Sequence, residues 1–344
     1  MKAHVLHGIN DLRYEDVEIP TVKDNEVLVN VKACGICGSD INRVFKTGTY
    51  HFPTVIGHEF SGIVINDDRW PEWSNKRVGI FPLKPCFKCD NCVNGDFELC
   101  RNYDYLGSRC DGGFEEYVSV PKWNLIELPD NVCFEQAAML EPASVAMHAL
   151  NRIIDIKDSS IAILGPGSIG NIIMRLAKIK GASSVTMLGR SQKQLDFASS
   201  FGADKVININ DDIESRVNEI TYGRGFDIVI EGIGINSSLS TAINIVKSGG
   251  DIVLLANPQD DVILSKEIYW KILRKQLVLS GTWNSSFGDT KNDWKQVLGL
   301  LESGCLDLTP IISHKLEFGS LHKGLEIMKN KNIFSNKVML YNNG

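Results

Sequence analysis

Four cysteines within a short stretch have the spacing of a metal site. Cys86, Cys89, Cys92 and Cys100 follow the pattern Cys-x2-Cys-x2-Cys-x7-Cys. Four thiolates of one loop can surround a zinc ion as a tetrahedron, with Zn–S distances of about 2.3 Å. Because binding by deprotonated sulfur contributes folding free energy, the ion would hold a loop that has little apolar content of its own. We therefore predict a closed, structural zinc site.

Two other interpretations of these cysteines stay open. Bacterial ferredoxins begin with the same spacing, but their fourth cysteine follows after three residues and precedes proline. Here the gap is seven residues and Arg101 follows the fourth cysteine. A pair of disulfides is the other alternative. The spacing favours zinc over both.

A second set of possible metal ligands is spread along the first part of the chain. It comprises Cys-Gly-Ile-Cys-Gly-Ser-Asp at residues 34–40, Gly-His-Glu at 57–59 and Leu-Glu-Pro at 140–142. Zinc accepts Cys, His and Glu, and three protein ligands leave a fourth position open for substrate or water. The pattern is therefore typical of a catalytic rather than a closed zinc site.

Each of these residues, taken singly, has an ordinary alternative role. Cys34 and Cys37 could form a redox pair, and His58 could be a hydrogen-bonded core histidine. Glu141 could be a charge placed at the start of a helix, where carboxylates are favourable.

Gly-Pro-Gly-Ser-Ile-Gly at residues 165–170 has the pattern of a dinucleotide-binding turn. It follows the apolar strand expected at 161–164 and opens a helix expected at 169–180. The glycines allow a tight turn, a close approach to the pyrophosphate and close helix–strand packing, and the helix N-terminus attracts the phosphates. The alternative is a turn whose glycines serve packing alone. The predicted binding residues are Gly165, Gly167, Ser168, Ile169 and Gly170.

The end of the next strand favours NADP over NAD. NAD-binding chains usually place Asp or Glu there to accept hydrogen bonds from the ribose. This strand instead ends in Gly189, Arg190 and Ser191. Glycine makes room, arginine can hold a phosphate through charge-assisted bonds, and serine can donate another bond. Alternatively, Arg190 is a solvated surface residue, or stacks on adenine in an NAD enzyme.

A change in the pattern of predicted strands and helices divides the chain into domains. Up to about residue 150, short strand-like runs between glycines and prolines predict an irregular, mostly β domain. From residue 159 onward, apolar strands alternate with amphipathic helices, which predicts a doubly wound parallel sheet covered on both faces. The predicted boundaries are 1–150, with the cysteine lobe at about 85–101, then 151–285, and a segment 286–344 that returns to the first domain.

Composition excludes several classes of protein. The 344 residues are 43% hydrophobic and 23% charged, as in ordinary globular proteins. A net charge of -6 argues against a nucleic-acid-binding zinc protein. The N-terminal sequence lacks a signal-peptide core, no apolar run is long enough for a membrane span, and nine cysteines read as reduced thiols. We expect a cytoplasmic protein without membrane or nucleic-acid partners.

Taken together, these motifs resemble the zinc-dependent medium-chain dehydrogenases, in their polyol (sorbitol-type) branch. The resemblance spans nearly the whole chain and includes Asp-Gly-Gly-Phe at 111–114. Further similarity at 39–46, 60–62, 105–109 and 270–275 is to galactitol-1-phosphate dehydrogenases and related enzymes. The resemblance implies a GroES-like catalytic domain and a Rossmann domain, two zinc ions per chain, and a dimer or tetramer. Pairing of the strand region 252–255 could support either assembly.

The resemblance also implies roles for single residues. Cys37 and His58 would bind the catalytic zinc, and Glu59 and Glu141 would ligate it directly or through water. Glutamate at 141, where alcohol dehydrogenases carry cysteine, points to polyols, and Cys34 would be structural. Ser39 would hydrogen-bond the substrate oxygen and pass on its proton.

Two departures from the family pattern affect the expected chemistry. Many relatives carry a proton-relaying histidine where this chain has Asn42, which cannot titrate. The Gly189-Arg190 pair replaces the aspartate common in this branch. For a substrate phosphate, Arg43, Lys46 and Arg109 are candidates because they flank the ligand segments, although each could be solvated surface charge.

The expected reaction is hydride transfer between a secondary alcohol of a polyol, or polyol phosphate, and NADP or NAD, giving the ketose or ketose phosphate. Alternatives are a sorbitol, butanediol or pentitol-phosphate dehydrogenase of the same family, and a zinc-free quinone reductase. A nucleotide-binding zinc protein acting as redox sensor or scaffold is the non-catalytic alternative.

Overall fold

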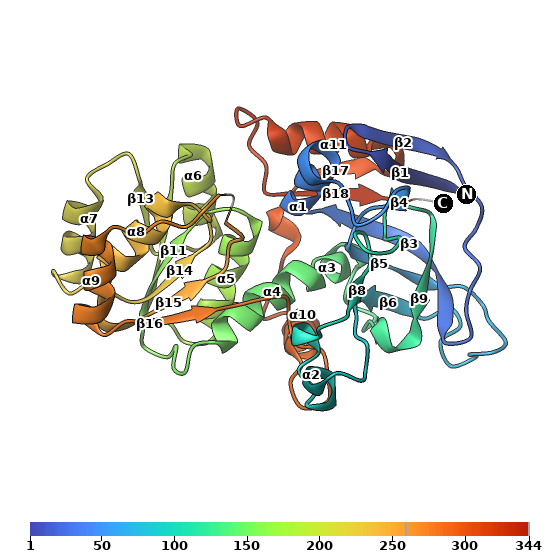
Figure 1. Cartoon of the computed structure of the whole chain (residues 1–344), viewed down its shortest axis with the longest axis horizontal. Coiled ribbons are helices and arrows are strands. Elements are labelled where there is room, and N and C mark those ends of the chain that lie inside the picture. Colours follow the sequence, from blue (N-terminus) through green and yellow to red (C-terminus); the bar gives the residue numbers. More distant parts are fainter. Residues whose placement is uncertain (259, 343–344) are drawn as a thin grey trace. The chain divides into compact units, whose positions relative to one another are not determined.

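The computed structural model describes residues 1–258 and 260–342. The chain forms two compact units, Met1–Ser144 together with Ser286–Gly344, and Val145–Ser285 (Figure 1). The first boundary lies earlier than the position after residue 150 expected from the sequence. It falls within the continuous helix α4 (Leu140–Asn151), where the sequence has no break that could mark it. Among the described residues, no helix is long and apolar enough to cross a lipid bilayer.

The first unit is built around β3 (Glu26–Ile36), a long strand that contacts three others. β3 pairs antiparallel with β5, β9 and β18 in a sheet of order β10-β6-β5-β3-β18-β17. A smaller sheet has the order β2-β1-β4, and β7 pairs with β8. The remaining strands are β1 (Lys2–Gly8), β2 (Asp11–Asp16), β4 (Thr54–Val55), β5 (Glu59–Val64), β6 (Arg77–Ile80), β7 (Leu83–Lys84), β8 (Asp104–Tyr105), β9 (Tyr117–Pro121), β10 (Leu125–Glu127), β17 (Ile312–Glu317) and β18 (Lys337–Tyr341).

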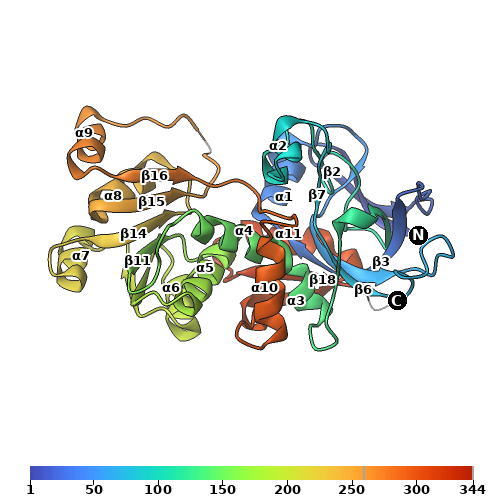
Figure 2. The ribbon, with the colours of Figure 1, turned by 90° about the horizontal axis from the view of Figure 1, so that it is seen from below.

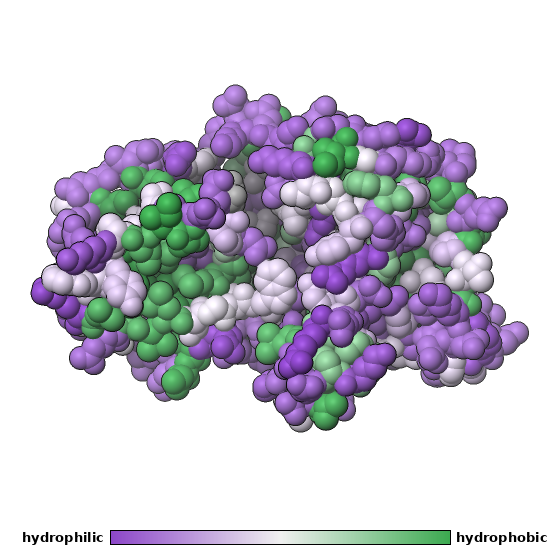
Figure 3. Space-filling model, in the orientation of Figure 1, coloured by the Kyte–Doolittle hydropathy of each residue, from purple (hydrophilic) through white to green (hydrophobic). Residues whose placement is uncertain are grey.

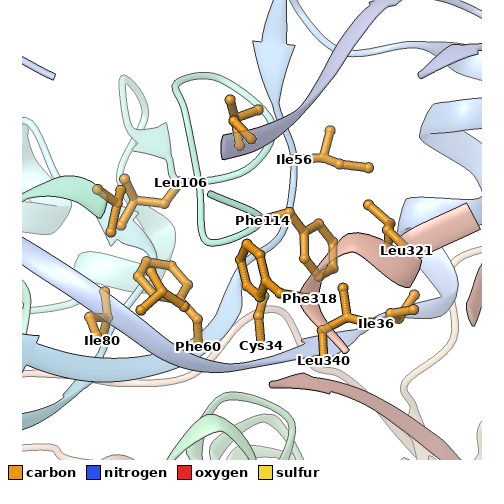
Figure 4. Close-up of a cluster of buried hydrophobic side chains, with 14 of the residues drawn as sticks. Cys34, Ile36, Ile56, Phe60, Ile80, Leu106, Phe114, Phe318, Leu321 and Leu340 are labelled. Carbon is orange, nitrogen blue, oxygen red and sulfur yellow. The ribbon is translucent and has the colours of Figure 1, made fainter. Parts of the chain in front are cut away.

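Helices in this unit are short, as expected for a mostly β domain. Besides α4 they are α1 (Gly38–Asn42), α2 (Asp90–Val93), α3 (Phe134–Ala138), α10 (Asp293–Glu302) and α11 (Leu321–Lys329). Short π or 3₁₀ turns are η1 (Arg43–Thr47), η2 (Phe97–Leu99), η3 (Lys122–Asn124), η4 (Thr309–Ile311) and η5 (Phe318–Ser320). Residues near both ends of the chain share one core, in which Phe60 and Phe114 pack with Leu321 and Leu340 (Figure 4).

The second unit is a six-stranded parallel sheet of order β13-β12-β11-β14-β15-β16, the strand order of a Rossmann domain. Its strands are β11 (Ser160–Leu164), β12 (Ser184–Gly189), β13 (Lys205–Asn208), β14 (Phe226–Glu231), β15 (Val246–Leu254) and β16 (Val278–Gly281). The central strands are apolar because both faces are covered. The predicted α/β class, with a mostly β domain and a doubly wound sheet, is confirmed.

Five helices cover this sheet. α5 (Ser168–Ile179) and α6 (Gln192–Phe201) lie on one face, and α7 (Ile213–Thr221), α8 (Asn236–Ile245) and α9 (Lys266–Lys275) lie on the other (Figures 1 and 2). The amphipathic stretch at 192–201 of the sequence predicts a helix there, and α6 confirms it. A second amphipathic stretch, at 239–246, predicts a helix through Val246, but α8 ends one residue earlier, because Val246 already pairs with Phe226 as the first residue of β15.

The strand region proposed for subunit pairing is interior to the sheet. Ile252 and Val253 are fully buried, and β15 pairs with β14 on one side and β16 on the other. That expectation was therefore wrong, because both edges of the strand are already occupied. β13 and β16 are the edge strands of this sheet. Val278 of β16 and Leu273 of α9 are exposed apolar residues, and Figure 3 shows apolar side chains gathered over the second unit.

Candidate active site and metal centres

Strand register in the first unit brings together the ligand segments. β3 pairs with β5 so that Gly35 lies opposite Glu59, which places the end of β3 beside the start of β5. Cys37 follows β3 directly and caps α1, and His58 directly precedes β5. Segments separated by some twenty residues therefore meet at one end of the sheet, because antiparallel strands run in opposite directions.

Cys37, His58 and Glu59 form a candidate metal centre. One ligand atom from each lies within 4.8 Å of the other two. Nδ1 of His58 lies 3.5 Å from Nη1 of Arg43 and 3.6 Å from Oδ1 of the fully buried Asp40, which leaves Nε2 to face a metal. A carboxylate behind a ligating imidazole is the usual support that fixes its orientation.

Burial strengthens the case for a cation here. It raises the pKa of the Cys37 thiol, and the neighbouring Glu59 and Asp40 carboxylates raise it further. Lys337 and Arg43 offset the charges of Glu59 and Asp40. The charge still to be compensated is therefore that of a Cys37 thiolate, which is costly in a buried place unless a further cation shares the space. The residues present thus fit the zinc ion that the sequence predicts.

Lys337, the first residue of β18, holds Glu59 from the other side. Its ammonium donates to both carboxylate oxygens of Glu59, at 2.7 Å to Oε1, and to the carbonyl of Ile36 at 3.3 Å. The side chains of both members of this ion pair are almost completely buried. Sequence reasoning missed Lys337, since nothing in the local sequence shows that β18 lies beside β3.

Glu141 lies in the first turn of α4 and is a neighbour of this group rather than a member of it. Its Oε1 accepts a hydrogen bond of 3.0 Å from the Tyr105 hydroxyl. Burial raises the pKa of Glu141 to about 7, with the negative charges of Glu59 and Cys37 adding to the effect. The Tyr105 ring lies 5.8 Å from that of His58. Tyr105 is thus a further candidate that the sequence showed only as part of a longer motif.

Ser39 belongs to a hydrogen-bond network around Arg43. Nη1 of Arg43 donates to Oγ of Ser39 and to Oδ1 of Asp40, both at 2.8 Å. The Asp40 carboxylate also accepts from the Cys37 backbone N–H at 2.9 Å. The charge of Arg43 is therefore paired with a buried carboxylate.

The other two phosphate candidates lie in different surroundings. Lys46 is exposed in the last turn of η1. Arg109 is half-buried and stacks between two tyrosine rings. Asn42 is exposed at the end of α1.

The four-cysteine lobe has the dimensions of a tetrahedral site. Its sulfurs are separated by 3.5 Å (Cys89–Cys92), 3.9 Å (Cys86–Cys92) and 4.0 Å (Cys89–Cys100). Zinc–sulfur distances of about 2.3 Å require S–S edges of about 3.8 Å in a regular tetrahedron. All nine cysteines are free thiols, which removes the two-disulfide alternative. Backbone N–H groups, first that of Arg101, lower the pKa of Cys89 to about 6 and so favour the thiolate that binds metal.

The glycine-rich turn of the second unit has the local geometry that the motif predicts. Gly165 has φ of +111°, which favours glycine. A Cβ on Gly170 would lie 2.0 Å from the Gly165 carbonyl oxygen, whereas a Cβ on Gly167 would meet nothing within 4 Å. Gly167 caps α5, whose first residues are Ser168 and Ile169. The third glycine thus serves packing, and the second leaves open space beside a helix N-terminus.

At the end of β12, the structure gives a different reason for Gly189. A Cβ there would lie 2.4 Å from Cγ of Pro166, so close packing on the glycine-rich turn requires glycine. Arg190 and Ser191 follow as exposed residues, and no acidic residue among those described pairs with Arg190.

Comparison with known proteins agrees with this architecture. The alcohol dehydrogenase GroES-like domain family matches residues 23–130, and the zinc-binding dehydrogenase family matches residues 168–303. The chain is 32% identical to galactitol 1-phosphate 5-dehydrogenase of Escherichia coli K12, over 99% of each sequence. The chain belongs to the zinc-binding alcohol dehydrogenase family. It is an oxidoreductase.

Solved structures of this dehydrogenase family are similar over nearly the whole chain. Galactitol-1-phosphate dehydrogenase from Escherichia coli superposes with a TM-score of 0.91 at 31% identity, covering 99% of this chain and 100% of that one. A putative zinc-binding dehydrogenase from Sinorhizobium meliloti bound to NADP has a TM-score of 0.88 at 27% identity, covering 99% of both. A short chain alcohol dehydrogenase from Escherichia coli CFT073 complexed with NADH has a TM-score of 0.89 at 26% identity, covering 99% of both.

Proposed function

We propose that this dehydrogenase transfers hydride between a secondary alcohol of a polyol phosphate, of the galactitol-1-phosphate type, and a nicotinamide cofactor. The observation that carries the proposal is the meeting of Cys37, His58 and Glu59 within 4.8 Å, with Glu141 beside them. The full-length similarity to galactitol 1-phosphate 5-dehydrogenase supports the substrate class. The product would be the corresponding ketose phosphate.

The two expected cofactors would supply the reactive chemistry. Bound zinc supplies Lewis acidity toward a substrate hydroxyl, and bound nicotinamide accepts the hydride. The donor set fits zinc, and the glycine-rich turn fits a pyrophosphate. In this proposal Cys37, His58, Glu59 and Glu141 hold the catalytic ion, and the four-cysteine lobe holds a second, structural one.

The surrounding side chains orient the substrate and hold its proton. Because Arg43 donates to Oγ of Ser39, the hydroxyl hydrogen of Ser39 is left to be shared with another acceptor. Ser39 is thereby placed to accept a hydrogen bond from the substrate hydroxyl; as it takes up that proton, its own hydroxyl hydrogen passes to the second acceptor, so that Ser39 relays a proton and stays neutral. Tyr105 donates to Glu141 and fixes the orientation of that carboxyl group. Asn42 is exposed and cannot titrate, so the proton does not leave through its side chain.

For the cofactor we propose NADP in preference to NAD. Support comes from Arg190 and Ser191, whose side chains are exposed at the end of β12, where no acidic residue in the described part of the chain pairs with the arginine. The charge of an arginine attracts the extra phosphate of NADP. We expect Arg190→Gln to raise KM for NADP about ten-fold or more and to leave KM for NAD nearly unchanged.

One assay tests the reaction and both specificities. Galactitol 1-phosphate, galactitol, sorbitol, 2,3-butanediol and a pentitol phosphate are each supplied with NADP and NAD, and reduction is followed by nicotinamide absorbance. The highest kcat/KM is expected for a polyol phosphate with NADP. Absence of reduction with every polyol, in protein shown to contain zinc, would contradict the proposal. Turnover in Ser39→Ala equal to that of the parent across neutral pH would remove Ser39 from the mechanism.

A further inference from the structure

The guanidinium of Arg109 lies between two tyrosine rings. Its Cζ is 4.2 Å from the centroid of Tyr50 and 4.3 Å from that of Tyr103. Nη2 donates to the Tyr50 hydroxyl at 3.2 Å, and Nη1 donates to the Tyr103 carbonyl at 3.1 Å. Within the described part of the chain, no carboxylate pairs with Arg109. The residue therefore keeps a positive charge that no acid neutralises.

This arrangement leaves the edge of the guanidinium available to a ligand. Arginine has five N–H donors in one plane, and the two bonds to Tyr50 and Tyr103 use only part of them. Because the two tyrosine rings lie close to Cζ, an anion can reach only the N–H groups that these residues leave open. In-plane approach is the geometry in which arginine binds phosphate through paired hydrogen bonds.

Arg109 lies close in the chain and in space to the candidate active site. Its backbone N–H donates to the Tyr105 carbonyl at 2.9 Å, in a tight turn. The same Tyr105 contacts Glu141 through its hydroxyl, and its ring neighbours that of His58. The rings of Tyr103 and Tyr105 are 6.4 Å apart. A series of direct contacts thus connects the arginine with the proposed zinc ligands.

The loop that carries Arg109 is fastened to the segment just before His58. Gly113 N–H donates to the Gly57 carbonyl at 2.8 Å, and Phe114 N–H donates to Ile56 at 3.0 Å. A Cβ on Gly107 or Gly112 would lie 2.3 Å or 2.0 Å from the Gly57 carbonyl oxygen. Phe114 is anchored in the core shown in Figure 4. The position of Arg109 relative to His58 is therefore fixed before any substrate binds, which lowers the entropic cost of binding.

The other two cations suggested by the sequence lack this combination. Arg43 already donates to the buried Asp40, so a phosphate would have to compete with a carboxylate held at 2.8 Å. Lys46 is exposed, and no ring or hydrogen bond from the described residues orients its ammonium. An unoriented surface lysine must lose side-chain entropy to bind an anion.

We infer that Arg109, held by Tyr50 and Tyr103, binds the terminal phosphate of the substrate and so determines specificity for polyol phosphates over plain polyols. The inference rests on the proposed function and names the residue that binds the phosphate group of the substrate. Arg109 takes no part in hydride or proton transfer. Its removal should therefore raise KM and leave kcat largely unchanged.

The test compares Arg109→Met and Arg109→Lys with the parent, using galactitol 1-phosphate and galactitol. In Arg109→Met, kcat/KM for the phosphate ester is expected to fall about 10- to 100-fold through KM, while that for galactitol changes less than about two-fold. Arg109→Lys should be intermediate, since it keeps the charge and loses the fork. Arg69→Met is the matched control, because Arg69 is an exposed arginine of the same unit that pairs with Asp67.

Calorimetric titration with inorganic phosphate provides a second readout that does not depend on turnover. The parent is expected to bind phosphate, and Arg109→Met to bind it at least about ten-fold more weakly. An equal fall in kcat/KM for galactitol 1-phosphate and for galactitol would show that Arg109 only stabilises the loop, and would overturn the inference. If Arg109→Met fails to fold, Tyr50→Leu tests the same clamp, because Tyr50 is 71% exposed. Activity without any preference for phosphate esters would overturn the inference and leave the proposed dehydrogenase function intact.

Discussion

His4 is a buried histidine whose environment disfavours its charged form. Nε2 lies 2.8 Å from the Phe318 carbonyl, and Nδ1 is buried without a hydrogen-bond partner. A neutral ring that donates from Nε2 satisfies this arrangement, whereas a proton on Nδ1 would find no acceptor. Burial accordingly lowers the pKa of His4 from 6.5 to about 4.

This shift predicts a loss of stability in mild acid. Because the unfolded chain binds the proton more strongly, stability is fully present above about pH 6.5 and declines toward pH 4 by about 3 kcal/mol in total. His4→Phe, which keeps a ring beside Tyr14, should unfold in urea with a smaller difference between about pH 7 and pH 5. His51→Gln, at an exposed histidine, is the control. An unchanged pH dependence in His4→Phe would assign the loss to other groups.

Because Lys337 and Glu59 form a buried ion pair, we expect the loss of either charge to destabilise the folded protein as long as the other charge remains. Lys337→Met leaves a buried carboxylate without its counter-ion, which should lower the free energy of unfolding by about 3–5 kcal/mol. Adding Glu59→Gln should recover part of that loss, since the orphaned charge is removed. Lys2→Met, at an exposed pair with Asp16, should cost about 1 kcal/mol or less. Denaturant unfolding of the parent, Lys337→Met, Glu59→Gln and the double variant measures the coupling, with Lys2→Met as the control; additive losses would show that the two residues act independently.

At the scale of elements, the glycines of the glycine-rich turn have two different roles: Gly170 is required for close packing, whereas Gly167 faces open space. Gly170→Ala would press a methyl group against the Gly165 carbonyl oxygen and should destabilise the protein by about 1–3 kcal/mol. Gly167 has φ of -84°, so Gly167→Ala is not strained and should cost less than about 1 kcal/mol. It should nevertheless weaken NADPH binding about ten-fold, because the methyl group fills the space that the pyrophosphate is expected to occupy. Equal nucleotide affinity in Gly167→Ala and the parent, measured by nucleotide fluorescence, would contradict this role.

The elements also show what the sequence could and could not predict. Periodicity placed the strands and helices of the second unit within a few residues, because apolar parallel strands and amphipathic helices leave strong local patterns. The sequence also indicates Cys37 and His58 as candidates, because cysteine and histidine are zinc ligands and both stand in short, recognisable motifs at 34–40 and 57–59. Lys337 and the Tyr50–Arg109–Tyr103 stack depend on pairing between distant segments, which leaves no local pattern. From the sequence, Gly189 indicates room for a phosphate; only the structure shows that a Cβ at this position would collide with Pro166.

At the scale of the whole molecule, both candidate metal centres belong to the first unit. Among the described residues, the two groups with metal-ligand geometry are the four-cysteine lobe and the Cys37, His58 and Glu59 cluster. Neither has a member in Val145–Ser285. We expect two zinc ions per chain by elemental analysis, one of which is lost in Cys37→Ser and the other in Cys89→Ser.

Removal of the metals should therefore weaken one unit and spare the other. A ligand bound only to the folded state stabilises by RT ln(1 + [L]/Kd), so stripping zinc removes that contribution where the zinc binds. Hydrogen exchange after chelation should accelerate in the cysteine lobe and at the start of β5, and stay unchanged in β11 and β14. Cys37→Ser is the matched comparison, because it should leave exchange in the lobe slow. Equal acceleration in both units, or a single zinc in the parent protein, would contradict this assignment of the metals.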